Sequence, residues 1–174
     1  MAIYYTVQPL GAMRQCLHMV PESAGVYMML LDQPDALEEA LSFVGLRHDP
    51  LSLGSRPVLY IGTTTRGMRT HMCRHLAPRS SASAFRMGIG AVLSHHLGLE
   101  VGQGEPGPGF DFSPASEKRL SDWLDIHVSV AMRIVGPLVD TVVGEIGDAN
   151  ETGHANDGDT FETKGLLVHS GAIH

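Results

Sequence analysis

The sequence contains little cysteine. Only two of its 174 residues are cysteines, and Cys16 and Cys73 lie far apart, outside any CxxC or Cys/His pattern with metal-ligand spacing. This usage is typical of reduced thiols in a cytoplasmic protein and argues against a structural zinc site. With 43% hydrophobic residues the chain can bury a core without disulfides, and its length suits one domain.

Long apolar runs are also missing. No stretch approaches the roughly 18 consecutive apolar residues that a membrane-spanning helix needs. The first residues, MAIYYTVQPLGAMRQC, lack the charged lead, the apolar run and the small-residue cleavage site of a signal peptide. We therefore expect a soluble, cytoplasmic protein without a membrane partner.

Acidic residues are absent from residues 50–99, although the whole sequence has 19 of them and a net charge of −7. The same segment carries half of the 12 basic residues, namely Arg56, Arg66, Arg69, Arg74, Arg79 and Arg86. Such segregation predicts a local positive field suited to a phosphate-bearing substrate. The alternative is a basic surface whose arginines pair with acids from elsewhere in the fold.

Hydrophobic periodicity and turn residues divide the chain into helices and strands. They predict strands at 24–31, 57–62 and 126–134, and helices at 34–45, 66–76, 84–97, 114–123 and 137–146. We expect residues 1–23 to be an N-terminal arm with a short helix around 12–19, and 24–146 to be the domain. Residues 147–174 read as a polar, acidic tail that can return as a short strand at 165–169.

Two tyrosine-containing triplets lie on the first two of these strands. GVY at 25–27 carries Tyr27, and YIG at 60–62 carries Tyr60. Three threonines, a helix, the run SAFRMGIGAVL at 83–93 and the segment LSDWL at 120–124 follow them. In this order the motifs resemble the GIY-YIG nuclease domain over about residues 25–146. The last two are similar to the STFR-x-SLGALL and LTxWM segments of one bacterial branch.

The resemblance implies an α+β fold, with a small antiparallel sheet flanked by helices and an insertion at 32–57 between the first two strands. It also implies an endonuclease that hydrolyses DNA. In that chemistry water attacks phosphorus, a tyrosine is the general base, and one divalent cation, Mg²⁺ or Mn²⁺, stabilises the leaving oxygen. A phenol, whose ordinary pKa is about 10, can act as a base only where neighbouring cations lower that pKa.

The resemblance places Tyr27, Tyr60 and His75 in the catalytic site, with Tyr27 as the base because the first strand's tyrosine lies deepest in the family's site. The family's arginine falls near Arg69 or His71, and both remain candidates. His71 and His75 are one helical turn apart and share a helix face. The alternative is that these histidines are exposed helix residues. A histidine in place of the arginine would make the site depend on pH.

Four further residues are expected to bind the substrate. Arg86, near the start of its helix, could contact a phosphate beside helix-terminal amide groups. Alternatively, it is a surface arginine next to the core stripe of that helix. Arg74, Thr63 and Ser83 complete the expected substrate-binding set.

The metal ligand is the position at which the sequence departs most from the family. The family's glutamate has Asp140 as its nearest counterpart, and Glu145 is the second choice. A carboxylate at either place could bind a hard cation, although the shorter aspartate has a different reach. The alternative is that Asp140 is a solvated helix residue.

Three functions are compatible with these features. We favour a metal-dependent phosphodiesterase acting on DNA, because of the two tyrosines and the acid-free basic segment. A binding module derived from a nuclease, without cleavage, would explain the imperfect arginine and glutamate positions. An enzyme that uses the tyrosine and histidine pocket on a small molecule would suit the acidic remainder of the chain.

Overall fold

An antiparallel sheet forms the centre of the protein. The computed structural model describes residues 6–44, 47–48, 51–65, 67–102 and 109–134, together with the short strands at 163–164 and 168–169. The strand order is β1-β6-β2-β5-β4, and β7 also pairs with β5. These strands are β1 (Thr6–Pro9), β2 (Gly25–Leu31), β4 (Ser52–Leu53), β5 (Arg56–Thr64), β6 (Val128–Ile134) and β7 (Thr163–Lys164). A separate pair joins β3 (Arg47–His48) to β8 (Val168–His169).

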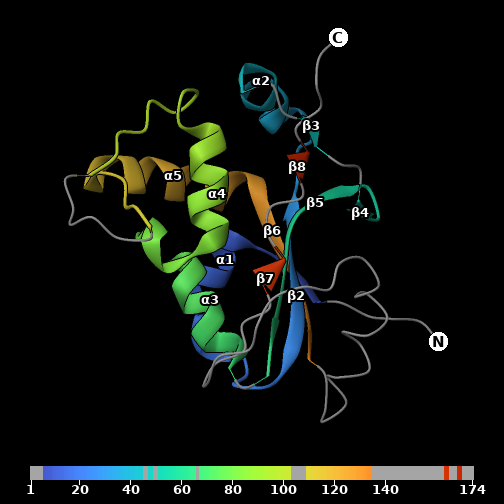
Figure 1. Cartoon of the computed structure of the whole chain (residues 1–174). Helices are drawn as coiled ribbons and strands as arrows, with labels where there is room; N and C mark the ends of the chain where they lie inside the picture. Colours follow the sequence, from blue (N-terminus) through green and yellow to red (C-terminus); the bar gives the residue numbers. More distant parts are fainter. Residues whose placement is uncertain are drawn as a thin grey trace, which may run out of the picture.

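Helices cover one face of this sheet. Figure 1 shows α1, α3, α4 and α5 together on one side of the strands, while α2 lies near one end. The helices are α1 (Leu10–Gln15), α2 (Asp35–Phe43), α3 (Met68–Leu76), α4 (Ala84–Leu93) and α5 (Pro114–His127), with 3-10 turns η1 (Leu17–Met19) and η2 (Ser80–Ala82). None of the described helices is long and apolar enough to cross a membrane. The α+β fold with a small antiparallel sheet flanked by helices is confirmed.

Alternation along β2 explains how the sheet builds two apolar faces. Tyr27, Met29 and Leu31 belong to the main core between sheet and helices, because side chains two residues apart in a strand share a face. Leu30 points the other way and joins Val58 and Ala131 in a second, smaller cluster. Since both faces of β2 are covered by apolar contacts, its sequence is apolar throughout rather than alternating.

Several element boundaries differ from the sequence prediction. The helix α5 continues to His127, so that β6 begins at Val128 and not at 126. Ile126 is exposed, and the alternating pattern there reflects a helix surface. The helix α4 ends at Leu93 rather than 97, and the turn after it includes Gly98 in the left-handed region, with φ 57°. The predicted helix at 137–146 lies outside the described residues.

The expected N-terminal arm contributes regular structure to the sheet layer. Its strand β1 pairs with β6, with Thr6 opposite Met132 and Pro9 opposite Ser129. Residues 12–19, predicted as one short helix, form the end of α1 and the turn η1. The expected insertion contains α2 and the short strands β3 and β4. Of the tail, the structure describes β7 at the edge of β5 and β8 against β3.

Candidate active site

Tyr27 and Tyr60 lie on neighbouring strands and on the same face of the sheet, as predicted. The strands β2 and β5 pair with Tyr27 opposite Gly62 and Met29 opposite Tyr60. Both phenol rings belong to the core beneath the helices, and their centroids are 6.2 Å apart. Gly62 has a physical role in this arrangement, because a Cβ atom there would overlap the Tyr27 phenol. The second triplet therefore supplies one tyrosine and the space for the other.

His75 lies between the two tyrosines and the start of α4. It projects from α3, and its Nε2 is 2.7 Å from Tyr27 Oη. Its ring centroid lies 5.3 Å from that of Tyr27 and 5.6 Å from that of Tyr60. With 5% of its surface exposed, His75 is a buried residue. The alternative of an exposed helix histidine is therefore wrong for His75.

Ser83 contacts His75 from the other side. Its Oγ is 2.7 Å from His75 Nδ1 and accepts the backbone N–H of Arg86 at 3.1 Å, which makes Ser83 the N-cap of α4. Only 3% of Ser83 is exposed. We expected Ser83 to bind substrate, but the structure buries it against the imidazole. A serine directly before a helix is a typical N-cap, whereas the contact with His75 depends on how α3 and α4 pack.

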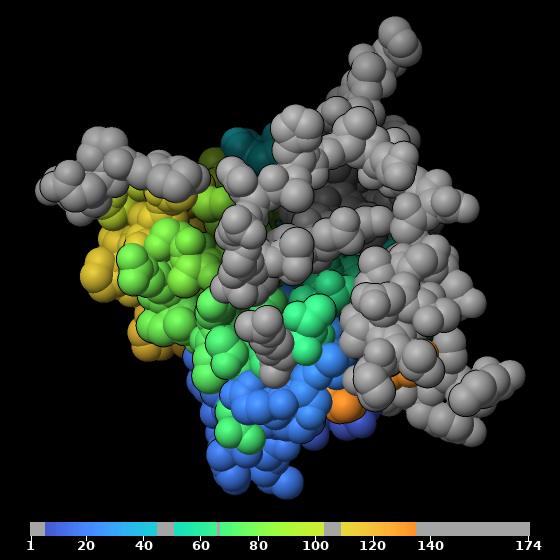
Figure 2. All heavy atoms as spheres, turned by 60° about the horizontal axis from the view of Figure 1, so that its bottom comes forward, coloured from blue at the N-terminus to red at the C-terminus, as the bar shows by residue number. Residues whose placement is uncertain are grey.

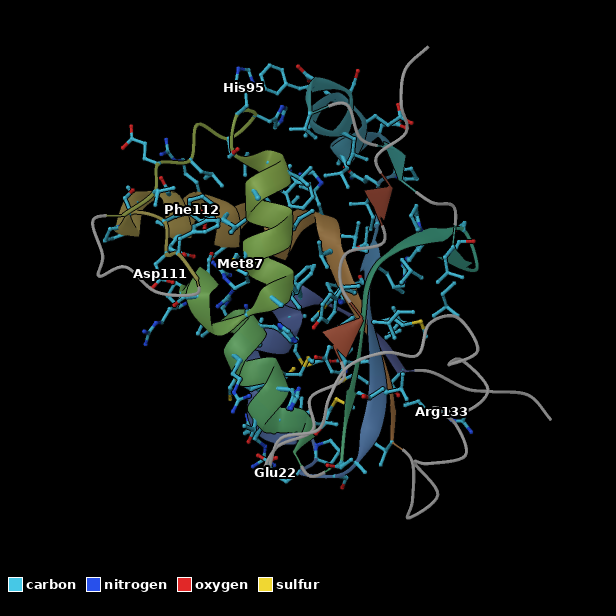
Figure 3. The ribbon with its side chains drawn as sticks, in the orientation of Figure 1. Glu22, Met87, His95, Asp111, Phe112 and Arg133 are labelled. Atoms are coloured by element: carbon cyan, nitrogen blue, oxygen red, sulfur yellow. The ribbon has the colours of Figure 1, made fainter. Side chains whose placement is uncertain are left out.

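The structure separates the two candidates for the family's arginine. The ring of His71 is half-buried and meets Tyr27 edge-on, with centroids 6.2 Å apart. Arg69 turns to the segment before β2, where its Nε donates to the Val20 carbonyl at 2.8 Å and lies 4.0 Å from Glu22. Figure 3 places Glu22 beside the first turn of α3, and in Figure 2 α3 (green) adjoins N-terminal residues (blue) on the surface. His71, not Arg69, therefore accompanies Tyr27.

Burial dominates the electrostatics of the site. It raises the pKa of Tyr27 well above the ordinary value; the neighbouring phenol of Tyr60 acts in the same direction, and the charge of Arg74 opposes them. Burial, followed by the charges of His71, Arg86 and Arg74, lowers the pKa of His75 to about 3. At neutral pH the imidazole is therefore uncharged and the phenol keeps its proton. The condition that neighbouring cations lower the pKa of the tyrosine is not met while Tyr27 is buried. From the resemblance we also expected both hydroxyls to open into one concave site that receives Arg69 or His71. Both tyrosines are 0% exposed, so that expectation is wrong.

Arg86 occupies a different place from either expectation. Its side chain is fully buried, and its Nη2 donates to Glu117 Oε2 at 2.6 Å and to Ser121 Oγ at 3.1 Å. Glu117 Oε1 also accepts the backbone N–H groups of Ser80 and Phe112. Arg86 is thus an internal residue that joins α4 to α5, and neither a surface arginine nor a phosphate ligand on an open face.

Acids from outside the acid-free segment neutralise most of its arginines. Four ion pairs do this: Arg56 with Asp32 at 3.1 Å, Arg69 with Glu22 at 4.0 Å, Arg79 with Asp111 at 3.4 Å, and Arg86 with Glu117 at 2.6 Å. Of the other expected substrate contacts, Arg74 is exposed and Thr63 half-buried, and Arg66 lies outside the described residues. We had also expected Arg69, Arg74, Arg79 and Arg86 to form one electropositive face; three of these four are paired with acids, so the face is not a set of open cations. The alternative of paired arginines holds for four of the six arginines of residues 50–99.

The expected metal ligands cannot be placed beside these side chains. Asp140 and Glu145 lie outside the described residues, and within the described part of the chain no group of three histidine, cysteine or acidic residues could hold a metal ion.

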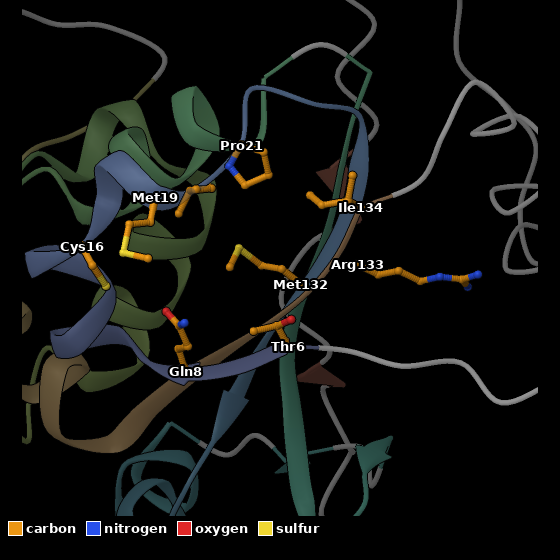
Figure 4. A pocket seen from close by; sticks show the side chains of 9 residues that line it. Thr6, Gln8, Cys16, Met19, Pro21, Met132, Arg133 and Ile134 are labelled. Carbon is orange, nitrogen blue, oxygen red and sulfur yellow. The ribbon is translucent and has the colours of Figure 1, made fainter.

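A pocket of about 540 Å³ lies between β1, β6 and the α1–η1 segment (Figure 4). Gln8, Cys16 and Met132 are among its lining residues, whereas Tyr27, Tyr60 and His75 are not.

A comparison with family models agrees with the fold and with the two tyrosine triplets. The model of the GIY-YIG catalytic domain matches residues 25–135, which is more than half of the chain. The chain therefore belongs to the GIY-YIG family, and a nuclease-type function follows at that general level. The match runs from the first residue of β2 to just beyond β6 and ends before Asp140. No curated protein and no solved structure matches the chain.

Proposed function

We propose that this protein hydrolyses phosphodiester bonds in DNA, with Tyr27 as the general base. Membership of the GIY-YIG family supports a nuclease-type function. The observation that carries the proposal is the 2.7 Å hydrogen bond between Tyr27 Oη and His75 Nε2. A buried phenol ordinarily has a hydrogen-bond partner. Here that partner is an imidazole on a neighbouring helix, a group that can stay bonded to the oxygen in either protonation state of the tyrosine.

The other side chains near Tyr27 have roles that follow from their positions. His71, half-buried at the edge of the Tyr27 ring, would donate a hydrogen bond to a phosphate oxygen. The charge of Arg74 favours ionisation of Tyr27, although burial outweighs it and the pKa of Tyr27 is raised. Because Tyr27 is fully buried, the reacting water must reach its oxygen when the substrate binds. The role of His75 is to hold the phenol oxygen, since a pKa of about 3 keeps the imidazole from carrying charge.

We expect cleavage to require Mg²⁺ or Mn²⁺, with Asp140 as the proposed ligand. The test incubates the purified chain with supercoiled, single-stranded and branched DNA, with either cation or with chelator. Cleavage should appear with the cation and disappear with chelator, and Asp140→Asn should abolish both activity and the metal requirement. Loss only in Glu145→Gln would assign the ligand to Glu145 instead. Salt-sensitive binding without cleavage would point to a binding module, and neither activity would favour a small-molecule enzyme.

The rate of cleavage should rise with pH across the neutral and mildly alkaline range. The raised pKa of Tyr27 means that the ionised fraction of this base grows about tenfold for each pH unit below that pKa. His75 should add no inflection there, because its pKa of about 3 lies far below this range. Single-turnover rates measured from about pH 6 to about pH 9 check this. A rate that falls with rising pH would contradict Tyr27 as the base.

A further inference from the structure

We propose that Ser83 is a positioning residue for the Tyr27–His75 pair. Its hydroxyl donates a hydrogen bond to His75 Nδ1 and so holds the imidazole in the tautomer that carries its hydrogen on Nε2. That hydrogen is then donated to Tyr27 Oη. The catalytic meaning of this arrangement rests on the proposed function, but the assignment of the tautomer does not.

The number of donors and acceptors around Ser83 Oγ decides whether this hydroxyl donates to His75 Nδ1 or accepts from it. A serine hydroxyl has one hydrogen and two lone pairs. The backbone N–H of Arg86 uses one lone pair at 3.1 Å, and His75 Nδ1 lies at 2.7 Å. No other hydrogen bond to this oxygen occurs within the described part of the chain, and burial keeps solvent away from it. The hydrogen must therefore go to Nδ1, because a buried donor without an acceptor costs more than one unused lone pair.

The tautomer then follows from the chemistry of a neutral imidazole. One ring nitrogen donates and the other accepts, so an accepting Nδ1 requires a hydrogen on Nε2. Nε2 faces Tyr27 Oη at 2.7 Å, and the phenol oxygen becomes the acceptor. The phenolic hydrogen of Tyr27 then points away from Nε2, because that nitrogen donates to the same oxygen.

The donation of a hydrogen bond from His75 Nε2 to Tyr27 Oη favours the action of Tyr27 as a base. As Tyr27 loses its hydrogen, negative charge develops on Oη, and a fixed N–H donor aimed at that atom stabilises it without reorganisation. The opposite tautomer would place a lone pair of His75 against the same oxygen. Ser83 is itself held in place, because it caps α4 and follows η2, whose Ser80 N–H is bonded to Glu117 Oε1 at 2.8 Å. The buried carboxylate of Glu117 thus fixes the segment that orients the imidazole.

The first test reads the tautomer directly and needs no activity. The full chain is labelled with ¹⁵N in its histidines, and a long-range ¹H–¹⁵N correlation spectrum shows which ring nitrogen carries hydrogen. Signals that vanish in His75→Gln are assigned to His75. We expect hydrogen on Nε2 of His75 at neutral pH. Hydrogen on Nδ1 would overturn the inference, whether or not the protein cleaves DNA.

The second test removes the hydroxyl but spares the helix cap. Glycine is nearly as good an N-cap as serine, so Ser83→Gly isolates the loss of the donor, and Ser83→Thr retains it. Ser113→Gly is the matched control, because Ser113 caps α5 in the same way away from the tyrosines. We expect Ser83→Gly to lose the single tautomer and about 10–100-fold in turnover, with Ser83→Thr and Ser113→Gly close to wild type.

Two outcomes separate the inference from the proposed function. If Ser83→Gly keeps hydrogen on Nε2 and full turnover, the inference is wrong and Tyr27 can still be the base. If the wild-type protein shows the Nε2 tautomer, and Ser83→Gly loses it, while no DNA is cleaved under any condition, the inference stands and the proposed function fails.

Discussion

Replacing Tyr27 with phenylalanine should lower DNA cleavage by about 10²–10⁴-fold, the range that a general base contributes. The substitution removes only Oη, and the ring continues to fill the core between the sheet and the helices. His75 Nε2, which lies 2.7 Å from Oη, loses this hydrogen-bond partner in the variant. Single-turnover cleavage, measured alongside thermal unfolding, checks this expectation.

The same variant should also be less stable, and this calls for a matched control. A buried polar group left without a partner costs about 1–3 kcal/mol, so Tyr27→Phe lowers the melting temperature. Ser129→Ala removes another buried hydrogen bond, from Ser129 Oγ to Asp32 Oδ2 at 2.7 Å, and should lower stability similarly while keeping turnover. Full wild-type turnover in Tyr27→Phe would make the tyrosine-centred mechanism wrong.

Local patterns in the sequence were enough to predict that Tyr27 and Tyr60 lie on neighbouring buried strands. An apolar run predicts a buried strand, and the resemblance predicts that the two strands with the tyrosine triplets are neighbours, as they are. The structure adds the register, which puts Gly62 opposite Tyr27. Helical spacing also put His71 and His75 on one face of α3. The choice between Arg69 and His71 needed the structure, because it depends on the segment before β2, which supplies the Val20 carbonyl to Arg69.

Charge and contact partners were less accessible to sequence reasoning. The sequence shows that residues 50–99 contain no acids. The electrostatic field around their arginines, however, depends on which acids from other segments fold against them. Arg56 meets Asp32, which precedes the segment, and Arg79 meets Asp111, which follows it. We predicted Ser83 as a substrate contact, and its bond to His75 arises only when α3 and α4 pack. Such long-range pairs have no periodic signal.

Replacing Glu117 with glutamine should cause the largest loss of stability, about 3–5 kcal/mol, because it leaves the Arg86 guanidinium buried without its counter-charge. Arg86 Nη2 lies 2.6 Å from Glu117 Oε2, and both side chains are almost wholly inaccessible. Within the described residues Arg86 Nε and Nη1 have no hydrogen-bond partner. Arg86→Met should therefore cost less, since it removes these donors and leaves the carboxylate bonded to Ser80 and Phe112 N–H groups.

The pH dependence of this stability has a definite sign. Burial opposes ionisation of Glu117, but the hydrogen bonds from Arg86 and Ser80, together with the Arg86 charge, outweigh it and lower the pKa of Glu117. A lowered folded-state pKa stabilises the protein above the unfolded value of about 4.3, and the contribution is lost as pH falls through the folded value. The difference in unfolding free energy between wild type and Glu117→Gln should therefore shrink in acid.

The exposed pair of Lys118 and Asp122 provides the matched control, because its N···O distance is also 2.6 Å. The two pairs differ in burial, since the Lys118 and Asp122 side chains are 75% and 56% exposed. Asp122→Asn should change the free energy of unfolding by no more than about 1 kcal/mol. Denaturant titration of the variants measures both effects. If Glu117→Gln cost as little as Asp122→Asn, the Arg86–Glu117 pair would not be what fixes α4, and with it Ser83, against α5.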